Sequence, residues 1–229
     1  MTTLRLLDNI VWHSLSGPHA SFAVGSERVR RYAEGYSQLI GAAEPAAPDF
    51  DALAAFCRPG EQFYVAGWTG STPASWRLDV DAVMEQYVWD APPPAEPDLP
   101  LDRLGTAHVA EAMALVALTH PGPFGTRTLE LGEFYGVIDG GRLIAMAGER
   151  MHAGDLREVS AVCTHPAFQG RGLARRLMEK VVRGQLARGQ TPFLHLLSAN
   201  ATARALYERM GFRHHQTLAV RAVTYLGQL

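Results

Sequence analysis

The feature that most restricts the fold is a strand, a glycine loop and a long amphipathic helix in immediate succession. Residues 156–163 are predicted to form the strand and residues 172–188 the helix, and the loop places Gly170 and Gly172 directly before that helix. Glycine lets a ligand approach the main chain, and the first amides of a helix have no intrahelical partners. The pattern therefore favours an anion such as phosphate or pyrophosphate at this turn.

The spacing of this loop excludes two common phosphate loops. It is not a Walker loop, because no Gly-Lys-Ser/Thr follows. The dinucleotide fingerprint would need Gly or Ala at position 175, where this chain has Arg175. Arg171, Arg175 and Arg176 can instead add positive charge around an anion. Taken alone, the loop is also compatible with a plain strand-to-helix turn.

A second pattern lies further along the chain, where residues 192–212 predict a strand, a short polar turn and a helix that ends at a glycine. Together the two segments resemble the GNAT superfamily of acyl-CoA-dependent N-acetyltransferases. The loop pattern of that family, Gln/Arg-x-x-Gly-x-Gly/Ala, is met by Gln169, Gly172 and Ala174. Its later pattern is met by Asn200, Ala203, Leu206, Tyr207, Gly211 and Phe212. The nearest likeness is to glycine N-acyltransferase-like proteins, in which a separate N-terminal domain precedes the acyltransferase domain.

The resemblance implies acetyl-CoA (coenzyme A) as the cofactor. Main-chain amides of residues 171–174 would hold its pyrophosphate, and the pantetheine arm would pair like an added strand with residues 162–164. Asn200 would contact the same arm, although Asn at this position is also a frequent helix N-cap. The implied cofactor-binding residues are Val162, Cys163, Thr164, Gln169, Gly170, Arg171, Gly172, Leu173, Ala174, Arg175, Asn200, Ala203 and Tyr207.

Three groups are implied in catalysis by the same resemblance. The Val162 amide would polarise the thioester carbonyl, and Tyr207 would act as general acid. Glu158 is the candidate general base, directly or through water, because it shares one side of an extended strand with Val162. Glu149 is the second candidate for the base. Ordinary structural roles remain open for all of these side chains.

Several other residues suggest different chemistry, which the pattern does not favour. Cys163 could be imagined as an acyl-carrying nucleophile, but a strand cysteine is more often a small inert apolar residue. His165 and His195 match no catalytic position of the family. His214 and His215 are adjacent and no Cys or carboxylate cluster joins them, so we predict no metal site.

The composition bounds the class of protein. The chain has 229 residues, of which 47% are hydrophobic and 19% charged, as expected of a globular protein with one large or two small domains. A net charge of -2 argues against nucleic-acid binding and against an anionic membrane surface. The two cysteines suggest a reducing compartment, and no signal pattern or membrane-spanning run is present. We therefore expect a soluble cytoplasmic protein.

The first half of the chain is predicted to be a smaller α/β domain, residues 1–90. A short strand is expected at 21–25, helices at 27–40 and 51–57, a strand at 62–67, and a strand or strand-helix piece at 76–89. The layout of residues 51–68 is similar to that of residues 176–197, so this half is interpreted as either a degenerate GNAT-like copy or an unrelated α/β domain. Residues 91–98 contain four prolines and are predicted to form an extended linker.

The acyltransferase domain is predicted to span residues 99–229. We expect a helix at 106–118, a loop at 120–128, and a hairpin at Asp139-Gly140-Gly141, followed by the strand of residues 156–163 that precedes the glycine loop. The resulting fold class is α/β (α+β), with a mixed, mostly antiparallel sheet flanked by helices. By resemblance, the loop after the first helix borders the acceptor pocket, and Phe124 and Arg127 are candidate substrate contacts unless it is a plain surface loop.

These patterns together predict an enzyme that transfers an acetyl group from acetyl-CoA to a primary amine of a small molecule or amino acid. The transfer would be a direct attack in a ternary complex. Two alternatives stay open, a cofactor-binding but inactive sensor and an N-acyltransferase for a longer acyl group. The resemblance also allows a homodimer, although no surface pattern identifies an interface.

Overall fold

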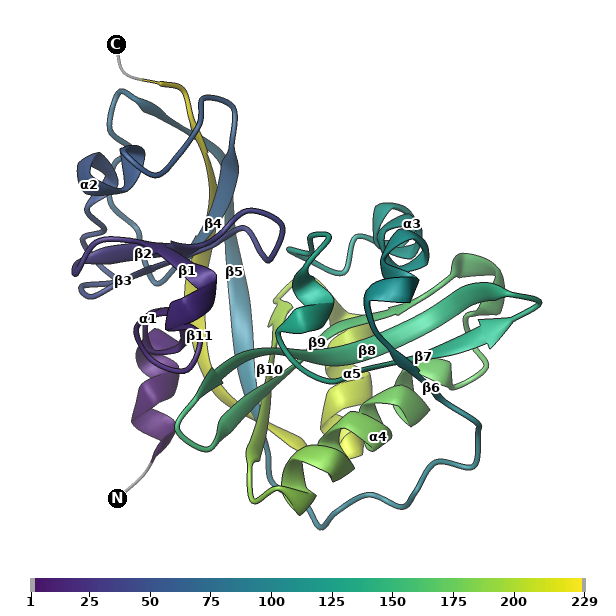
Figure 1. Cartoon of the computed structure of the whole chain (residues 1–229). Helices are drawn as coiled ribbons and strands as arrows, with labels where there is room; N and C mark the ends of the chain where they lie inside the picture. Colours follow the sequence, from purple (N-terminus) through teal and green to yellow (C-terminus); the bar gives the residue numbers. More distant parts are fainter. Residues whose placement is uncertain (1–2, 228–229) are drawn as a thin grey trace.

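Two long strands, β5 (Trp76–Trp89) and β11 (Phe212–Tyr225), form the centre of the molecule (Figure 1). They belong to a computed structural model that describes residues 3–227. They pair antiparallel along their whole length. β5 has β10 (Thr191–Leu197) as its second neighbour, and β11 has β4 (Gln62–Ala66). The two halves of the chain therefore share one continuous sheet.

The remaining elements flank this centre in chain order. The N-terminal half contributes α1 (Ile10–Ser16), β1 (Ala23–Gly25), β2 (Val29–Tyr32), β3 (Leu39–Ala42) and α2 (Phe50–Ala54). The C-terminal half contributes β6 (Asp102–Leu104), α3 (Val109–Thr119), β7 (Phe134–Asp139), β8 (Arg142–Ala153), β9 (Leu156–Thr164), α4 (Leu173–Ala187) and α5 (Ala201–Met210). Among the described residues the sheet order is β1-β2-β3-β4-β11-β5-β10-β9-β8-β7-β6. This mixed sheet flanked by helices confirms the predicted fold class.

One helix prediction in the N-terminal half was wrong. Residues 27–40 form the antiparallel strands β2 and β3 instead, with a turn at Gly35 whose φ is +89°. The spacing of apolar residues there suits a helix, but Tyr32 is fully buried in a core that the paired strands form together with α1 and with residues of β8, β9 and β10. Tertiary packing thus outweighed the helical spacing of the apolar residues in this short segment. The helix predicted after Asp49 is confirmed as α2, and the Asp49 side chain accepts a hydrogen bond from the Ala52 amide.

The predictions for the C-terminal half agree with the structure more closely. Gly140 and Gly141 both have positive φ and close the hairpin between β7 and β8. The helix predicted at 106–118 is present as a short 3-10 turn followed by α3. β9 and β10 are parallel, as expected for strands joined by the crossover helix α4.

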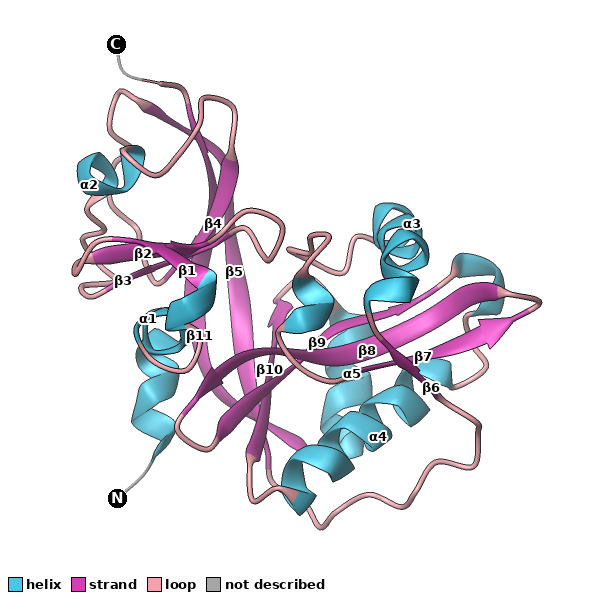
Figure 2. Ribbon diagram, viewed as in Figure 1, coloured by secondary structure: helices cyan, strands magenta, loops and turns pink. Residues whose placement is uncertain are grey.

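Helices cover both faces of the β7–β10 part of the sheet (Figure 2). α4 packs on one face through Leu177, Met178 and Val182, which are fully buried. α3 packs on the other face together with Phe134 and Met146. No helix within residues 3–227 is long and apolar enough to cross a membrane.

Residues 91–98 form no helix or strand, as their prolines predict. The segment runs along α4, where Glu96 pairs with Lys180 at 2.6 Å and with Arg183 at 2.8 Å. β5, which precedes this segment, lies between β10 and β11, which follow it. The division into domains 1–90 and 99–229, and the origin of the first as a degenerate copy, stay predictions.

Candidate active site

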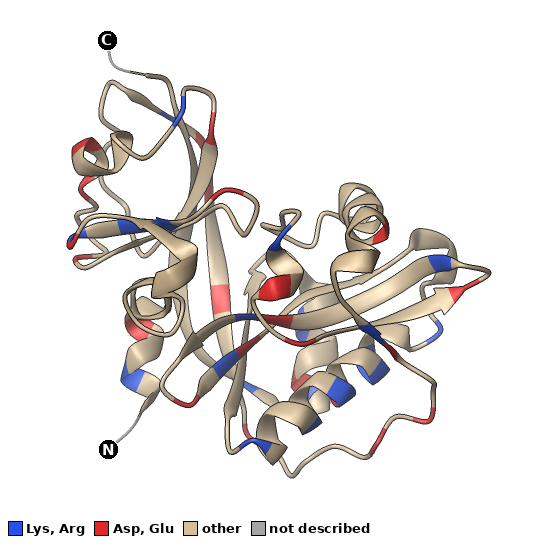
Figure 3. Ribbon diagram, in the orientation of Figure 1, with Lys and Arg blue, Asp and Glu red and all other residues tan. Residues whose placement is uncertain are grey.

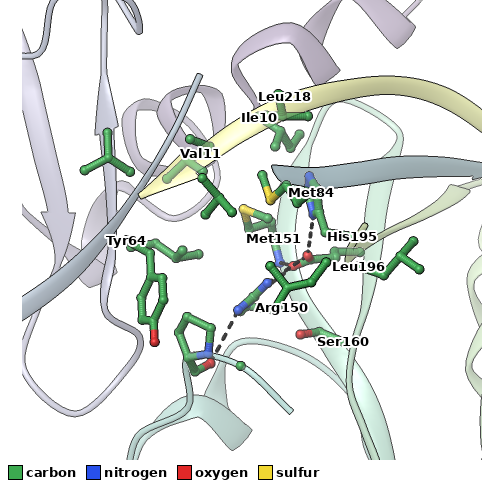
Figure 4. A pocket seen from close by; sticks show the side chains of 18 of the residues that line it. Ile10, Val11, Tyr64, Met84, Arg150, Met151, Ser160, His195, Leu196 and Leu218 are labelled. Carbon is green, nitrogen blue, oxygen red and sulfur yellow. Dashed lines mark hydrogen bonds and ion pairs between the residues drawn. The ribbon is translucent and has the colours of Figure 1, made fainter. Parts of the chain in front are cut away.

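A cavity of about 510 Å³ lies where the two halves of the molecule meet (Figure 4). β9, β10 and the start of α5 supply one wall. The opposite wall comes from residues 7–11, from β3 and β4, and from the central strands β5 and β11. Residues 119–123, at the end of α3 and just after it, close the rim. Of the residues singled out in the sequence, Glu158, Val162, Asn200 and Tyr207 are brought together here.

The divergence of β9 and β10 opens this cavity. The two parallel strands pair only between residues 156–158 and 191–193, and the later residues of both strands line the cavity instead. β9 also carries a bulge, in which Ala161 has a φ of +52° and neither Ala161 nor Val162 has a register partner in β8. A non-glycine residue in this region is strained, and such strain is often found at functional sites.

The residues next to Val162 lie in different surroundings. Cys163 is buried among apolar side chains of α3 and β8, and burial raises the pKa of its thiol to about 11. This environment fits an inert cysteine rather than a nucleophile. Thr164 ends the strand, and the side-chain amide of Gln169 donates a hydrogen bond of 3.4 Å to the Thr164 carbonyl oxygen.

The glycine loop has an open backbone at the start of α4. Gly170 and Gly172 have φ of +78° and +74°, and the space where a Cβ would stand is empty at both positions. Gly172 is the N-cap residue and forms no side-chain cap, so the first amides of α4 face solvent. Leu173 is buried in the core, whereas Arg171 stacks on Phe168 at 4.8 Å.

Basic side chains surround this opening. Arg175 pairs with Glu179 at 2.8 Å and remains largely exposed. Figure 3 shows further basic positions along α4. An uncapped helix start with adjacent arginines is suited to bind a phosphate group.

Asn200 and Tyr207 border the cavity from α5. The Asn200 side chain accepts a hydrogen bond from the Ala203 amide at 3.0 Å, so it caps the helix while it lines the cavity. Ala203 packs against the core beneath it. Tyr207 is 8% exposed, and burial raises the pKa of its hydroxyl to about 12. Within residues 3–227 that hydroxyl forms no hydrogen bond, and Tyr207 is among the residues that line the cavity.

Glu158 is the most tightly held charge in the cavity. Arg150 binds its carboxylate through two hydrogen bonds of 2.9 Å, and His195 Nδ1 lies 2.9 Å from it (Figure 4). The Met151 amide donates a further bond of 3.2 Å. Burial alone would raise the pKa of Glu158, but Arg150 and His195 outweigh burial and lower that pKa to about 2.

This ion pair is part of a polar row that crosses five strands of the sheet. Gln86 bridges His195 at 2.9 Å and Gln216 at 2.8 Å. His195 Nδ1, on the other side of the ring, faces the Glu158 carboxylate, so the imidazole lies between Gln86 and Glu158. Neither Arg150 nor Gln86 was predicted from the sequence to lie at the site. A charged residue inside the apolar run of residues 143–151 was the available signal for Arg150.

Two candidate substrate residues lie outside the cavity. Phe124 is 7% exposed and packs on Phe134, with ring centroids 6.1 Å apart. Arg127 stacks over Tyr36 at 4.3 Å and pairs with Glu130 at 2.7 Å, so it joins the two halves of the molecule. The neighbouring residues 119–123 line the cavity instead.

The remaining candidates have structural contacts. Glu149 is buried and pairs with Arg157 at 2.9 Å and with Arg188, away from the cavity. His165 Nδ1 accepts a hydrogen bond from the Ala167 amide and caps a 3-10 turn.

Comparison with known proteins identifies the family. A crystal structure from Novosphingobium aromaticivorans, described as an acetyltransferase from the GNAT family, is 39% identical to this chain. The match covers 96% of this chain and 98% of the Novosphingobium chain, with a TM-score of 0.87. A GCN5-related N-acetyltransferase from Kribbella flavida covers 100% of this chain and 97% of its own with a TM-score of 0.63, and at 12% identity it shares the fold alone.

Two further matches are confined to part of the chain. The family model described as FR47-like protein matches residues 134–220. The N-alpha-acetyltransferase RimI of Mycobacterium tuberculosis is 39% identical over 56 residues, which are 24% of this chain and 34% of RimI. The resemblance to the glycine N-acyltransferase-like branch stays a prediction. Because the Novosphingobium relative is 39% identical and is matched over nearly its whole length, the chain belongs to the GNAT family of acetyltransferases.

Proposed function

We propose that this protein transfers the acetyl group of acetyl-CoA to a primary amine of a small molecule. One observation carries the proposal. The cavity opened by the divergence of β9 and β10 is bordered by Tyr207, and the glycine loop after β9 leads to the uncapped start of α4.

The residues present fit a donor that carries a pyrophosphate and a long arm. Gly170 and Gly172 leave open space at the main chain, and Arg171 and Arg175 can neutralise phosphate charge. Residues 162–164 would hold the arm through main-chain contacts where β9 has parted from β10. When bound, acetyl-CoA supplies an activated thioester: a C–N bond forms, the C–S bond breaks, the amine loses a proton and the sulfur gains one.

The Val162 amide is the proposed donor to the thioester carbonyl oxygen. The bulge at Ala161 turns this part of β9 away from its ladder with β8, which leaves main-chain groups available to a ligand. A well-placed donor to a developing oxyanion is worth about 3 kcal/mol. Tyr207 would donate to the leaving sulfur, and its raised pKa keeps the hydroxyl protonated at neutral pH.

For Glu158 we infer a positioning role rather than direct proton abstraction. Its carboxylate already accepts hydrogen bonds from Arg150, His195 and the Met151 amide, and a pKa of about 2 makes it a weak base. The amine would instead enter as the neutral form, or lose its proton to water. Glu158 would keep His195 and Arg150 fixed at the floor of the cavity.

A thiol-release assay with acetyl-CoA tests the proposal. We would measure wild type, Tyr207→Phe and Glu158→Gln against a panel of amines, and titrate each protein with CoA. Tyr207→Phe should lower kcat at least 10-fold with unchanged CoA affinity, because only the proton donor is lost. Absence of CoA binding in wild type would overturn the proposal.

Glu158→Gln separates a base from a positioning residue. Loss of a buried ion-pair partner should cost about 3–5 kcal/mol of folding free energy. If Glu158 only positions its neighbours, the pH dependence of kcat/KM for the remaining activity keeps its shape. A general base would remove the acid limb of that profile in the variant, which would restore the original assignment.

A further inference from the structure

The cavity has two chemically different walls. The wall formed by β9, β10 and α5 carries the polar groups assigned above to the acetyl donor. The opposite wall is supplied by residues 7–11, by β3 and β4, and by the facing segments of β5 and β11. Since the donor side is occupied in the proposed reaction, the acceptor must meet this second wall.

The second wall is almost entirely apolar. Its side chains include Ile10, Val11, Ile40, Val65, Val80 and Leu218. The polar exceptions are few. The Asn9 amide is committed to the Ala42 carbonyl at 2.8 Å, Asp8 is exposed to solvent, and Tyr64 offers a single hydroxyl.

The two buried charges in the cavity, Arg150 and Glu158, are paired with each other. Arg150 is the only Lys or Arg among the residues that line the cavity, and Glu158 holds it at 2.9 Å. The remaining contact of Arg150 is to the Pro123 carbonyl at 3.4 Å. A carboxylate on the acceptor would therefore find no free Lys or Arg, and only the exposed His120 imidazole at the rim, whereas a second ammonium would find only the solvent-exposed Asp8. Burying an unpaired charge is costly.

We infer that the acceptor is a primary amine carried on an uncharged apolar body, such as an arylalkylamine. This inference rests on the proposed acetyl transfer and narrows its substrate class, and it disfavours free amino acids and polyamines. Most of the apolar wall precedes residue 134, so it lies outside the segment that the FR47-like model matches. The acceptor chemistry is thus set by the part of the chain that this family segment does not include.

A matched set of amines tests the inference in the full-length protein. 2-Phenylethylamine would be compared with phenylalanine, which adds a carboxylate, with phenylalaninamide, which mimics a peptide N-terminus, and with spermidine. Acetyl-CoA and octanoyl-CoA would serve as donors, and CoA binding would be measured by calorimetry. We expect kcat/KM for 2-phenylethylamine to exceed that for phenylalanine by about 100-fold, because the added carboxylate is desolvated without a partner.

Two charge insertions on β5 provide a matched pair of variants. Val80 is 46% exposed and lines the cavity, whereas Val83 is 48% exposed and does not. Val80→Arg should lower kcat/KM for 2-phenylethylamine and shift the ratio toward phenylalanine by about 10-fold, since the new guanidinium can pair with the carboxylate. Val83→Arg should leave that ratio within about twofold, because alternate strand residues face opposite sides.

The outcomes separate the two levels of the proposal. No binding of CoA would overturn the acetyl transfer itself. Binding of CoA with phenylalanine, phenylalaninamide or spermidine as the best acceptor would overturn the apolar-amine inference while the acetyl transfer stands. Turnover of none of the four amines would also overturn the apolar-amine inference. A preference for octanoyl-CoA would overturn it too, since the apolar wall would then hold the acyl chain.

Discussion

The two halves of the molecule arrange their strands in the same order around the centre of the sheet. In the N-terminal half β1, β2 and β3 are antiparallel neighbours, and β3 is parallel to β4 across α2. In the C-terminal half β7, β8 and β9 are antiparallel neighbours, and β9 is parallel to β10 across α4. Each parallel pair opens toward the cavity, one toward the apolar wall and the other toward the donor side.

The halves differ at the start of the crossover helix. α4 has fifteen residues, begins at Gly172 without a side-chain cap, and is flanked by Arg171 and Arg175. α2 has five residues, and the Asp49 carboxylate already accepts from the Ala52 amide. The same topology is thus open to an anion in one half and closed by a carboxylate in the other. The proposed anion site would therefore depend on the loop residues and not on the fold.

The largest predicted effect concerns the separation of the halves. A fragment of residues 99–229 lacks β5, which lies between β10 and β11 in the sheet. We expect this fragment to show no cooperative unfolding transition, because two strands lose their ladder partner and their apolar contacts. Thermal unfolding of the fragment and the full chain would check this. A sharp transition together with CoA binding by the fragment would show that the C-terminal half folds independently.

A pH effect of about 3 kcal/mol is expected from His19 in the N-terminal half. Burial, with the positive charge of Arg157, lowers the pKa of His19 to about 4. Since the unfolded chain then binds the proton more readily, stability is full above pH 6.5 and falls as the pH drops from 6.5 to 4. When the free energy of unfolding is measured by urea unfolding across this pH range, it should fall less with decreasing pH in His19→Asn than in wild type. The exposed His215→Asn serves as control, and an equal change in both variants would contradict the assignment.

A smaller effect is expected when Gly172 at the start of α4 is replaced by Asp, the residue that caps α2 in the N-terminal half. Gly172→Asp places a carboxylate at the N-cap and should weaken CoA binding by about 10- to 100-fold through charge repulsion. Gly189→Asp is the matched control. Its φ of +70° imposes similar strain at the other end of α4, also in open space. Equal loss of CoA affinity in both variants would mean that strain, and not the cap charge, is responsible.

The smallest predicted effect comes from removing the carboxylate cap of α2 in the N-terminal half. Asp49→Ala removes the hydrogen bond to the Ala52 amide and should cost about 1 kcal/mol of folding free energy. CoA affinity should not change, because α2 offers no anion site in wild type. Denaturant unfolding and calorimetry would measure the two quantities, with Asp51→Ala as a control for lost charge alone. A change in CoA affinity would show that the two halves are coupled at this loop.

The sequence by itself determined the elements that short-range chemistry controls. Glycines at 140, 141 and 172 marked turns that need positive φ, and Asn200 marked a helix start through its side-chain cap. The amphipathic helix predicted after Gly172 is α4, which connects the parallel strands β9 and β10. The glycine loop, Asn200 and Tyr207 were found in the same way, because the patterns that carry them are local.

Only the tertiary structure decided the features that join distant residues. The exchange of β5 and β11 between the halves cannot be read from local patterns, because each strand has partners more than a hundred residues away. The pairing of Glu158 with Arg150 depends on the bulged register of β8 and β9, and it lowers the pKa of a carboxylate that otherwise looks like a base. The apolar wall likewise exists only once residues 7–11, 39–42 and 80–84 are packed together. Burial and pairing across the sheet, not sequence spacing, set the chemistry of the cavity.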